Sequence, residues 1–322
     1  MPLRIFKSFV YCFVLSTVAA QSDPLRLSKL KRFEYTHPQM GTVFKIVLYA
    51  DDSLRASTAA RLAFDRVDTL NAHLSDYLPE SELNQLCAKA GSGEKTVVSA
   101  DLWAILRLSN QFSKLSGGAF DASIGPLTRL WRRARNLKTL PDSGRIAAAQ
   151  ALTNYRFLHF YKKKHRIRMD KAGMQLDLGG IAQGYAADAC LKILQEQGFN
   201  QALVDAGGDL SIGDPPPGQP GWKVDIPALE TKKQTLILSN CGITTSGASF
   251  RFLEIGGLRY SHVVDPRTGW GLTHRVLVTV QAPTGVEADA WATALSVMGD
   301  EGWQKIKHKH PQLAVWLREA KF

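Results

Sequence analysis

Residues 176–188, reading LDLGGIAQGYAAD, have types and spacing that suit the binding of an anion. The apolar stretch 174–178 predicts a short strand, and the two glycines predict a tight turn because glycine adopts backbone angles that other residues avoid. A helix is expected from Ile181 onward, and backbone N–H groups at such a helix start point toward an anion. Asp177 at the turn would meet a sugar hydroxyl, a ring N–H or a metal. The alternative is a strand-to-helix turn without a ligand.

Two further pairs of residues have the types needed for phosphate or proton chemistry. Asp289 and Thr293 are four residues apart in a predicted helix over 285–298, so they share one face and could hold a cation. His262 and Asp265 stand at the end of a predicted strand, beside a Pro-Arg-Thr-Gly turn. The structural alternatives are a hydrogen-bonded pair on a helix face, a structural histidine, and a turn-forming aspartate before proline.

The elements that must position these residues mix helices and strands without a regular alternation. Apolar residues at helical spacing predict helices over 53–74 and 101–115. Strands are expected within 33–50 and over 202–204, 235–238, 243–245, 276–281 and 313–317, with a hairpin over 157–169. Residues 21–34 are expected to be a poorly ordered lead-in. This order favours an α+β fold over a doubly wound one.

The first twenty residues have the pattern of a cleaved signal peptide. Arg4 and Lys7 precede an apolar run over 9–18, and small residues at 18–20 predict cleavage before Gln21. No cysteine follows that site, so a lipid anchor is not expected. We therefore expect a mature chain of residues 21–322, exported to the periplasm.

Composition limits the classes of function. The 322 residues are 45% hydrophobic and carry a formal net charge of +11, concentrated in runs over 129–138 and 162–168. No nucleic-acid-binding motif accompanies these runs, so a solvated basic face is expected and no nucleic acid partner. After cleavage three widely spaced cysteines remain, Cys87, Cys190 and Cys241, which we interpret as buried thiols, with one disulfide left open.

Taken together, these motifs resemble those of the ApbE family, the FAD:protein FMN transferases. The matching segments keep the family's order along nearly the whole mature chain: MGT (40–42), SDYLPESELNQL (75–86), SGGAFDASIGPL (116–127), LDLGGIAQGYAAD (176–188), DAGGD (205–209), TTSGAS (244–249), SHVVDPRTG (261–269) and EADAWATAL (287–295). Each segment is a weak signal alone, and the set is highly specific.

The resemblance implies one catalytic domain over residues 21–322, with a characteristic fold and activity. The fold would be ApbE-like (T-fold-like), with mixed, largely antiparallel sheets packed with helices and an FAD cleft between the layers. The activity would be Mg²⁺-dependent transfer of FMN from FAD to a threonine or serine hydroxyl of an acceptor protein, releasing AMP. Any membrane contact would come only through a membrane-bound acceptor.

The resemblance also implies roles for individual residues. Asp289, Thr293 and the backbone oxygen of Ala182 match the metal-binding set, which suits the preference of Mg²⁺ for oxygen ligands and substrate phosphates. His262 and Asp265 match active-site positions, and either is a candidate general base. The candidates for contact with FAD are Met40, Tyr77, Asp121, Asp177, Gly179, Gly180, Ser246, Gly247 and His262. Core packing is the alternative for Tyr77.

Three positions depart from the family's usual pattern. Gln183 stands where lysine is usual, Asp205 where asparagine is common, and Ser123 where threonine is usual. A lysine at the first position could meet a phosphate, so two alternatives stay open: hydrolysis of FAD to FMN and AMP with water as acceptor, and FAD binding without turnover. An Asp289–Thr293 metal site argues against the last, because binding alone needs no metal on the pyrophosphate.

Overall fold

The protein is built on a seven-stranded antiparallel sheet. The computed structural model describes residues 30–227, 234–247 and 252–321. Every neighbouring pair in the sheet is antiparallel. In spatial order the strands are β1 (Lys31–Gln39), β2 (Thr42–Ala50), β6 (Ala202–Ala206), β7 (Asp209–Ile212), β10 (Cys241–Gly247), β13 (His274–Ala282) and β14 (Ala314–Lys321).

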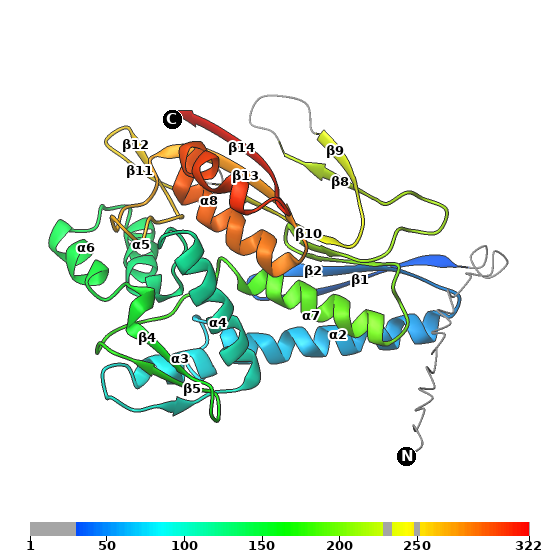
Figure 1. The fold of residues 1–322 in the computed structure, drawn as a ribbon, viewed down its shortest axis with the longest axis horizontal. Helices are drawn as coiled ribbons and strands as arrows, with labels where there is room; N and C mark the ends of the chain where they lie inside the picture. Colours follow the sequence, from blue (N-terminus) through cyan, green and yellow to red (C-terminus); the bar gives the residue numbers. More distant parts are fainter. Residues whose placement is uncertain (1–29, 228–233, 248–251, 322) are drawn as a thin grey trace, which may run out of the picture.

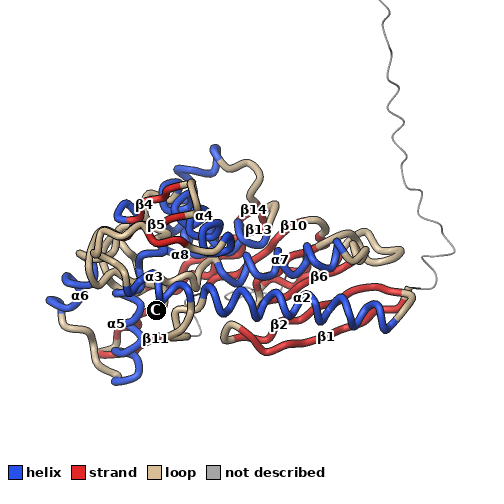
Figure 2. Tube along the Cα trace, turned by 90° about the horizontal axis from the view of Figure 1, so that it is seen from below, coloured by secondary structure: helices blue, strands red, loops and turns tan. Residues whose placement is uncertain are grey.

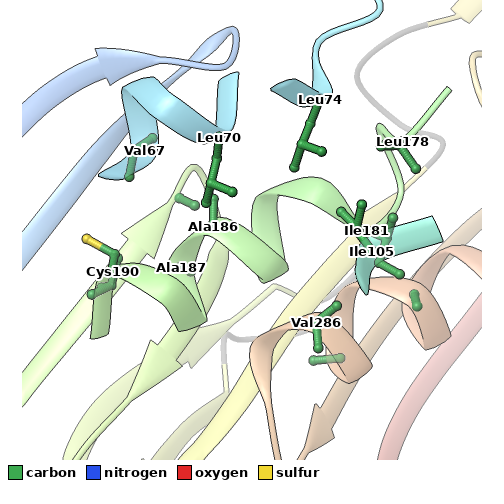
Figure 3. Close-up of a cluster of buried hydrophobic side chains, with 14 of the residues drawn as sticks. Val67, Leu70, Leu74, Ile105, Leu178, Ile181, Ala186, Ala187, Cys190 and Val286 are labelled. Carbon is green, nitrogen blue, oxygen red and sulfur yellow. The ribbon is translucent and has the colours of Figure 1, made fainter. Parts of the chain in front are cut away.

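Three long helices cover one face of this sheet: α2 (Ser53–Leu74), α7 (Ala182–Glu196) and α8 (Gly285–Ile306) (Figures 1 and 2). The Asp52 side chain caps α2 by accepting hydrogen bonds from the N–H groups of Leu54 and Arg55. Small residues let these helices approach closely in the core, as Figure 3 shows for Ala186 and Ala187 beside Leu70. The main hydrophobic core therefore lies between the sheet and these helices.

The opposite face of the sheet is covered in part by a hairpin of β8 (Trp222–Ile226) and β9 (Gln234–Leu238) (Figure 1). Side chains alternate between the two faces along each strand. Ile46 and Val204 therefore belong to the helix-side core, whereas Val47 and Leu203 belong to a second cluster with Trp222.

A second group of elements packs beside one end of the helical layer (Figure 1). Its helices are α3 (Glu82–Ala88), α4 (Ala100–Leu115), α5 (Gly125–Leu137) and α6 (Ser143–Gln150). Its strands are β3 (Thr96–Val97), β4 (Leu158–Tyr161), β5 (Arg166–Met169), β11 (Phe252–Ile255) and β12 (Leu258–Ser261). Three short 3-10 turns complete the described chain: η1 (Ala122–Ile124), η2 (Tyr155–Phe157) and η3 (Lys307–Lys309).

The α+β class and most predicted elements are confirmed, and two local predictions are wrong. Residues 174–178 form no strand, because the N–H groups of Leu176 and Asp177 donate to Cys87 Sγ and to the Ala122 carbonyl. Of the lead-in expected over 21–34, residues 31–34 belong to strand β1, which pairs along the whole length of β2, and residues 21–29 lie outside the described part of the chain. The basic run over 129–138, for which a solvated face was expected, belongs largely to helix α5, and its Arg129, Arg133 and Lys138 are exposed.

In the described part of the chain, Cys87, Cys190 and Cys241 are free, buried thiols. The predicted signal peptide, residues 1–20, lies outside the described residues. Within the described ranges, no helix is both long and apolar enough to cross a bilayer.

Candidate active site

A cleft of about 1060 Å³ lies between the start of α7, the end of β10 and helix α5. Its lining includes all but one of the residues that the sequence selected, although they come from segments far apart in the chain. These residues are Met40, Tyr77, Asp121, Asp177, Gly179, Gly180, Ala182, Ser246, Gly247, His262, Asp289 and Thr293. Gln183 and Asp205, two of the departures from the family pattern, line it as well.

The glycines of the central motif serve close packing more than unusual backbone angles. The turn was predicted because glycine adopts backbone angles that other residues avoid. Gly179 and Gly180 do not have positive φ, so that reason is wrong. A Cβ on Gly180 would lie 2.7 Å from Thr293 Oγ1, and one on Gly184 would lie 2.8 Å from the Asp289 Cβ. The start of α7 therefore approaches the Asp289–Thr293 face of α8 without intervening side chains.

Asp289 is a buried carboxyl at this contact. The N–H of Gly184 donates to Asp289 Oδ2 over 3.0 Å. Burial raises its pKa well above the ordinary value, and the nearby Asp209 and Asp188 add to the rise. Burial likewise raises the pKa of Asp209 to about 7. A cation bound here would favour the ionised carboxylates.

The oxygen atoms at this contact fit Mg²⁺. Asp289, Thr293 and Ala182 all line the cleft. A carboxylate, a hydroxyl and a backbone carbonyl are hard ligands that leave positions for phosphate oxygens and water. Among the described residues no three His, Cys, Asp or Glu side chains are grouped to hold a metal by themselves. A cation here would therefore need the hydroxyl, the carbonyl and substrate oxygens as well.

Arg132 of α5 connects three parts of the cleft wall. Its guanidinium donates to Asp177 Oδ2 over 2.7 Å and also forms an ion pair with Asp76. It lies over the Tyr77 ring, 4.4 Å from the centroid. The Tyr77 side chain is 71% exposed at the cleft, which excludes core packing as its role.

Sequence reasoning missed Arg132, since it interpreted the whole basic run as solvated. The available signal was the helical spacing of Leu127, Trp131 and Ala134, which places one arginine of the run toward the buried side. The Asp177 carboxylate accepts three hydrogen bonds, because Thr128 Oγ1 and the N–H of Gly179 also donate to it, at 2.7 and 2.8 Å. Asp177 is thus a fixed acceptor.

Asp121 turns its carboxylate into the protein. Ser123 donates to Oδ1 through its N–H (2.8 Å) and its hydroxyl (2.6 Å), and the N–H of Tyr155 donates to Oδ2 over 2.8 Å. Burial raises the pKa of this carboxyl. In the structure Asp121 therefore anchors the loop before α5, and contact with a flavin or adenine stays a prediction.

His262 and Asp265 are separated by the cleft wall. His262 lines the cleft, whereas Asp265 is not among the lining residues. The Asp265 carboxylate accepts hydrogen bonds from Arg267 Nε and Nη2, at 2.9 and 2.8 Å, and from the Arg267 N–H over 2.9 Å. This geometry favours His262 over Asp265 as the group that reaches a bound substrate.

Two other segments close the cleft on the sheet side. Met40 and Gly41 form the tip of the β1–β2 hairpin, and both have positive φ, 52° and 71°. This tip packs against the β6–β7 turn at Gly207, where any side chain would collide with Thr42. Ser246 and Gly247 end strand β10. A turn and a strand end thus hold these residues at one rim of the cleft.

The fold and the site together define a class: an α+β protein whose acid-rich cleft offers oxygen ligands for a cation beside the start of a helix. Comparison with known families matches residues 40–317 to the ApbE family, and the chain belongs to that family.

Relatives with known names and structures agree with this assignment. The FAD:protein FMN transferase of Klebsiella pneumoniae (strain 342) is 33% identical over 288 residues, covering 86% of this chain and 81% of that protein. The enzyme of the same name from Treponema pallidum (strain Nichols) is 34% identical over 292 residues, covering 83% and 80%. The apo flavinyl transferase ApbE of Pseudomonas stutzeri superposes with a TM-score of 0.81 at 26% identity, covering 91% and 95%.

Proposed function

We propose that this chain transfers FMN from FAD to an acceptor protein and releases AMP. The observation that carries the proposal is the cleft itself, which gathers Asp289, Thr293 and Ala182 at the start of α7 in a chain that matches the ApbE family over residues 40–317. The relatives named FAD:protein FMN transferase support the same activity.

The acceptor group is a threonine or serine hydroxyl in this proposal. Its oxygen forms a bond to the phosphorus of the FMN half, and the bond from that phosphorus to the bridging oxygen breaks as AMP leaves. His262 lines the cleft and takes the proton of the attacking hydroxyl. Tyr77 offers an exposed ring on which a flavin or adenine can stack, backed by Arg132.

Magnesium is part of the proposal. Asp289, Thr293 and the Ala182 carbonyl would hold Mg²⁺, which when bound supplies charge neutralisation for the pyrophosphate. The acidic lining supports this requirement, because Asp76, Asp177, Asp205, Asp209 and Asp289 all line the cleft and would repel an anionic substrate without a cation.

Hydrolysis of FAD is the second candidate, with water in place of the acceptor hydroxyl. Gln183 lines the cleft as a neutral amide where the family usually has lysine, so one contact to phosphate or carboxylate is absent at the transfer site. One experiment separates the two activities: incubation with FAD, Mg²⁺ and candidate acceptors, with mass spectrometry of the acceptor and an AMP assay. Transfer predicts acceptor mass gain with AMP; hydrolysis predicts AMP and free FMN without acceptor.

Export to the periplasm completes the proposal. It rests on the charged start, apolar run and small residues of positions 1–20. Cell fractionation with N-terminal sequencing is expected to find the protein in the periplasm, beginning near Gln21. Uncleaved protein in the cytoplasm would defeat it.

A further inference from the structure

The tip of the β1–β2 hairpin forms one rim of the active-site cleft, where Gln39, Met40, Gly41 and Thr42 all line it. Strand pairing ends at the Gln39–Thr42 pair, so Met40 and Gly41 form a two-residue turn. Both have positive φ, as in the type I′ turn that favours Asn-Gly. Methionine has no such preference, so its presence at this strained position points to a use for its side chain in the cleft.

Hydrogen bonds through the Gln39 side chain join this tip to helix α2. Gln39 Nε2 donates to Asp68 Oδ1 over 2.5 Å, and Gln39 Oε1 accepts from the Met40 N–H over 3.1 Å. We call these two bonds the hairpin link. They engage both ends of the Gln39 amide and satisfy a Met40 N–H that lies outside the strand ladder. Figure 2 shows the hairpin running alongside α2.

Asp68 accepts hydrogen bonds from two residues of β1. His37 Nε2 donates to the same Oδ1 over 2.8 Å, and the His37 ring stacks on Phe64 of α2, with centroids 5.1 Å apart. His37 and Gln39 are two residues apart on the strand, so both face α2. Burial acts to raise the pKa of Asp68, but the bonds from Gln39 and His37 outweigh it and lower the pKa, so the carboxylate is ionised at neutral pH.

Asp68 does not itself line the cleft, and its side chain is 46% exposed. It can therefore affect a ligand in the cleft only through the residues that it contacts. The other side of the tip meets the β6–β7 turn, where a side chain on Gly207 would collide with Thr42. The tip is thus held between α2 on one side and the β6–β7 turn on the other.

We propose that Asp68 is a positioning residue that acts through Gln39 to hold Met40 at the cleft rim for contact with bound FAD. This inference rests on the proposed transferase function, because it takes FAD as the ligand of the cleft. The hairpin link fixes the Met40 backbone before FAD arrives, so less conformational freedom is lost on binding. Breaking the link should weaken FAD binding and leave the chemistry at the metal site unaffected.

The test compares Asp68→Ala with Asp68→Asn and with Asp65→Ala. The alanine at 68 removes the acceptor, whereas asparagine keeps an oxygen for the Gln39 amide. Asp65 lies about one turn earlier on α2, has a 59% exposed side chain and pairs with Arg61 of the same helix, so Asp65→Ala is the matched control. FAD binding to the mature chain is titrated with Mg²⁺ present by flavin fluorescence, and turnover is measured as AMP release.

Asp68→Ala is expected to raise the Kd for FAD about fivefold, equivalent to about 1 kcal/mol of binding free energy, with kcat at saturating FAD unchanged. Asp68→Asn should stay within about twofold of the wild-type Kd, because the hydrogen bond from Gln39 is kept. Asp65→Ala should leave both the Kd and kcat unchanged.

A double-mutant cycle with Met40→Ala separates positioning from a general effect on stability. Met40→Ala alone should weaken FAD binding. Adding Asp68→Ala to that variant should cause no further loss of affinity, because the side chain that Asp68 positions is gone. A purely structural role for Asp68 would instead give losses that add.

Three results would each overturn the inference: wild-type FAD affinity in Asp68→Ala, an equal loss of affinity in Asp68→Asn, or an undiminished effect of Asp68→Ala in the Met40→Ala background. Failure of the proposed function is a different result. A wild-type chain that binds no FAD would refute that function and this inference with it, whereas wild-type binding that Asp68→Ala leaves unchanged refutes the inference alone.

Discussion

Asp289 combines burial with a position against the start of α7, and the raised pKa reflects a carboxyl that lacks a compensating positive charge. We expect Asp289→Asn to lower turnover by more than about 100-fold, since changes to residues that only support metal ligands already cost about 10–100-fold. FAD affinity measured by calorimetry should then lose its dependence on Mg²⁺.

Glu301→Gln is the matched control for that substitution. It removes an acid on the same helix whose side chain is 85% exposed, so turnover and Mg²⁺ dependence should be unchanged. Full activity of Asp289→Asn at low Mg²⁺ would remove Asp289 from the metal site.

We expect substitutions of His262 and Asp265 to affect different properties, turnover in the first case and stability in the second. His262→Ala should lower kcat by about 10²- to 10⁴-fold, the usual contribution of a general base, with a smaller change in FAD affinity. Asp265→Asn should mainly lower the melting temperature, because its carboxylate holds Arg267 and the turn behind the cleft wall. Measuring AMP release, FAD binding and thermal unfolding for both variants decides between them. Loss of turnover in Asp265→Asn alone would reverse the two roles.

At the scale of elements, α5 holds the cleft together through one side chain. Removing the Arg132 guanidinium leaves Asp76 and Asp177 close together and uncompensated, and the pKa of Asp76 is already raised by burial and by Asp177. We expect Arg132→Met to lower the free energy of unfolding by about 2–3 kcal/mol and to weaken FAD binding.

Arg133→Met is the control for that change, because Arg133 is the next residue of α5 and is exposed. Urea unfolding and flavin fluorescence titration measure both effects. Equal stability of the two variants would show that the links from Arg132 to Asp76 and Asp177 contribute little.

Over the whole molecule, three carboxyls meet where α7, α8 and β7 pack: Asp188, Asp209 and Asp289. Burial raises the pKa of each, although Asp188 accepts hydrogen bonds from Ser211 Oγ and from the N–H groups at the start of α8. This concentration of acids lies at the centre of the fold, so the stability of the protein should depend on pH and on cations.

Asp209 sets the direction in which stability changes with pH. Its pKa rises from 3.8 to about 7 on folding, so between these values the unfolded chain has lost a proton that the folded protein keeps. Stability of the metal-free protein should therefore fall as pH rises from about 4 to 7, with the contribution fully present below that window. Thermal unfolding of wild type and Asp209→Asn across this range measures it, and the Asn variant should lose this part of the dependence.

Added Mg²⁺ should oppose this loss of stability at higher pH, because carboxylates must lose their protons to bind the cation. The gain in melting temperature on adding Mg²⁺ should be larger at pH 8 than at pH 5. An equal gain at both values would contradict binding at these carboxyls.

The sequence by itself determined the α+β class, most helices and strands, and the identity of twelve cleft-lining residues. Helical spacing and capping residues act locally, so 53–74 was predicted without knowledge of its neighbours. The order of motifs pointed to the family, which in turn selected Asp289 and Thr293.

Only the tertiary structure decided which of these residues meet and what each one faces. Residues 174–178 form no strand because their backbone N–H groups bond to Cys87 and Ala122, and no local pattern encodes such distant contacts. Arg132 forms its ion pairs with segments that meet it only after folding. The position of Asp265 outside the cleft lining depends on long-range packing in the same way. Hydrophobic periodicity reports which side is buried, whereas the partner of a buried charge is fixed by long-range packing.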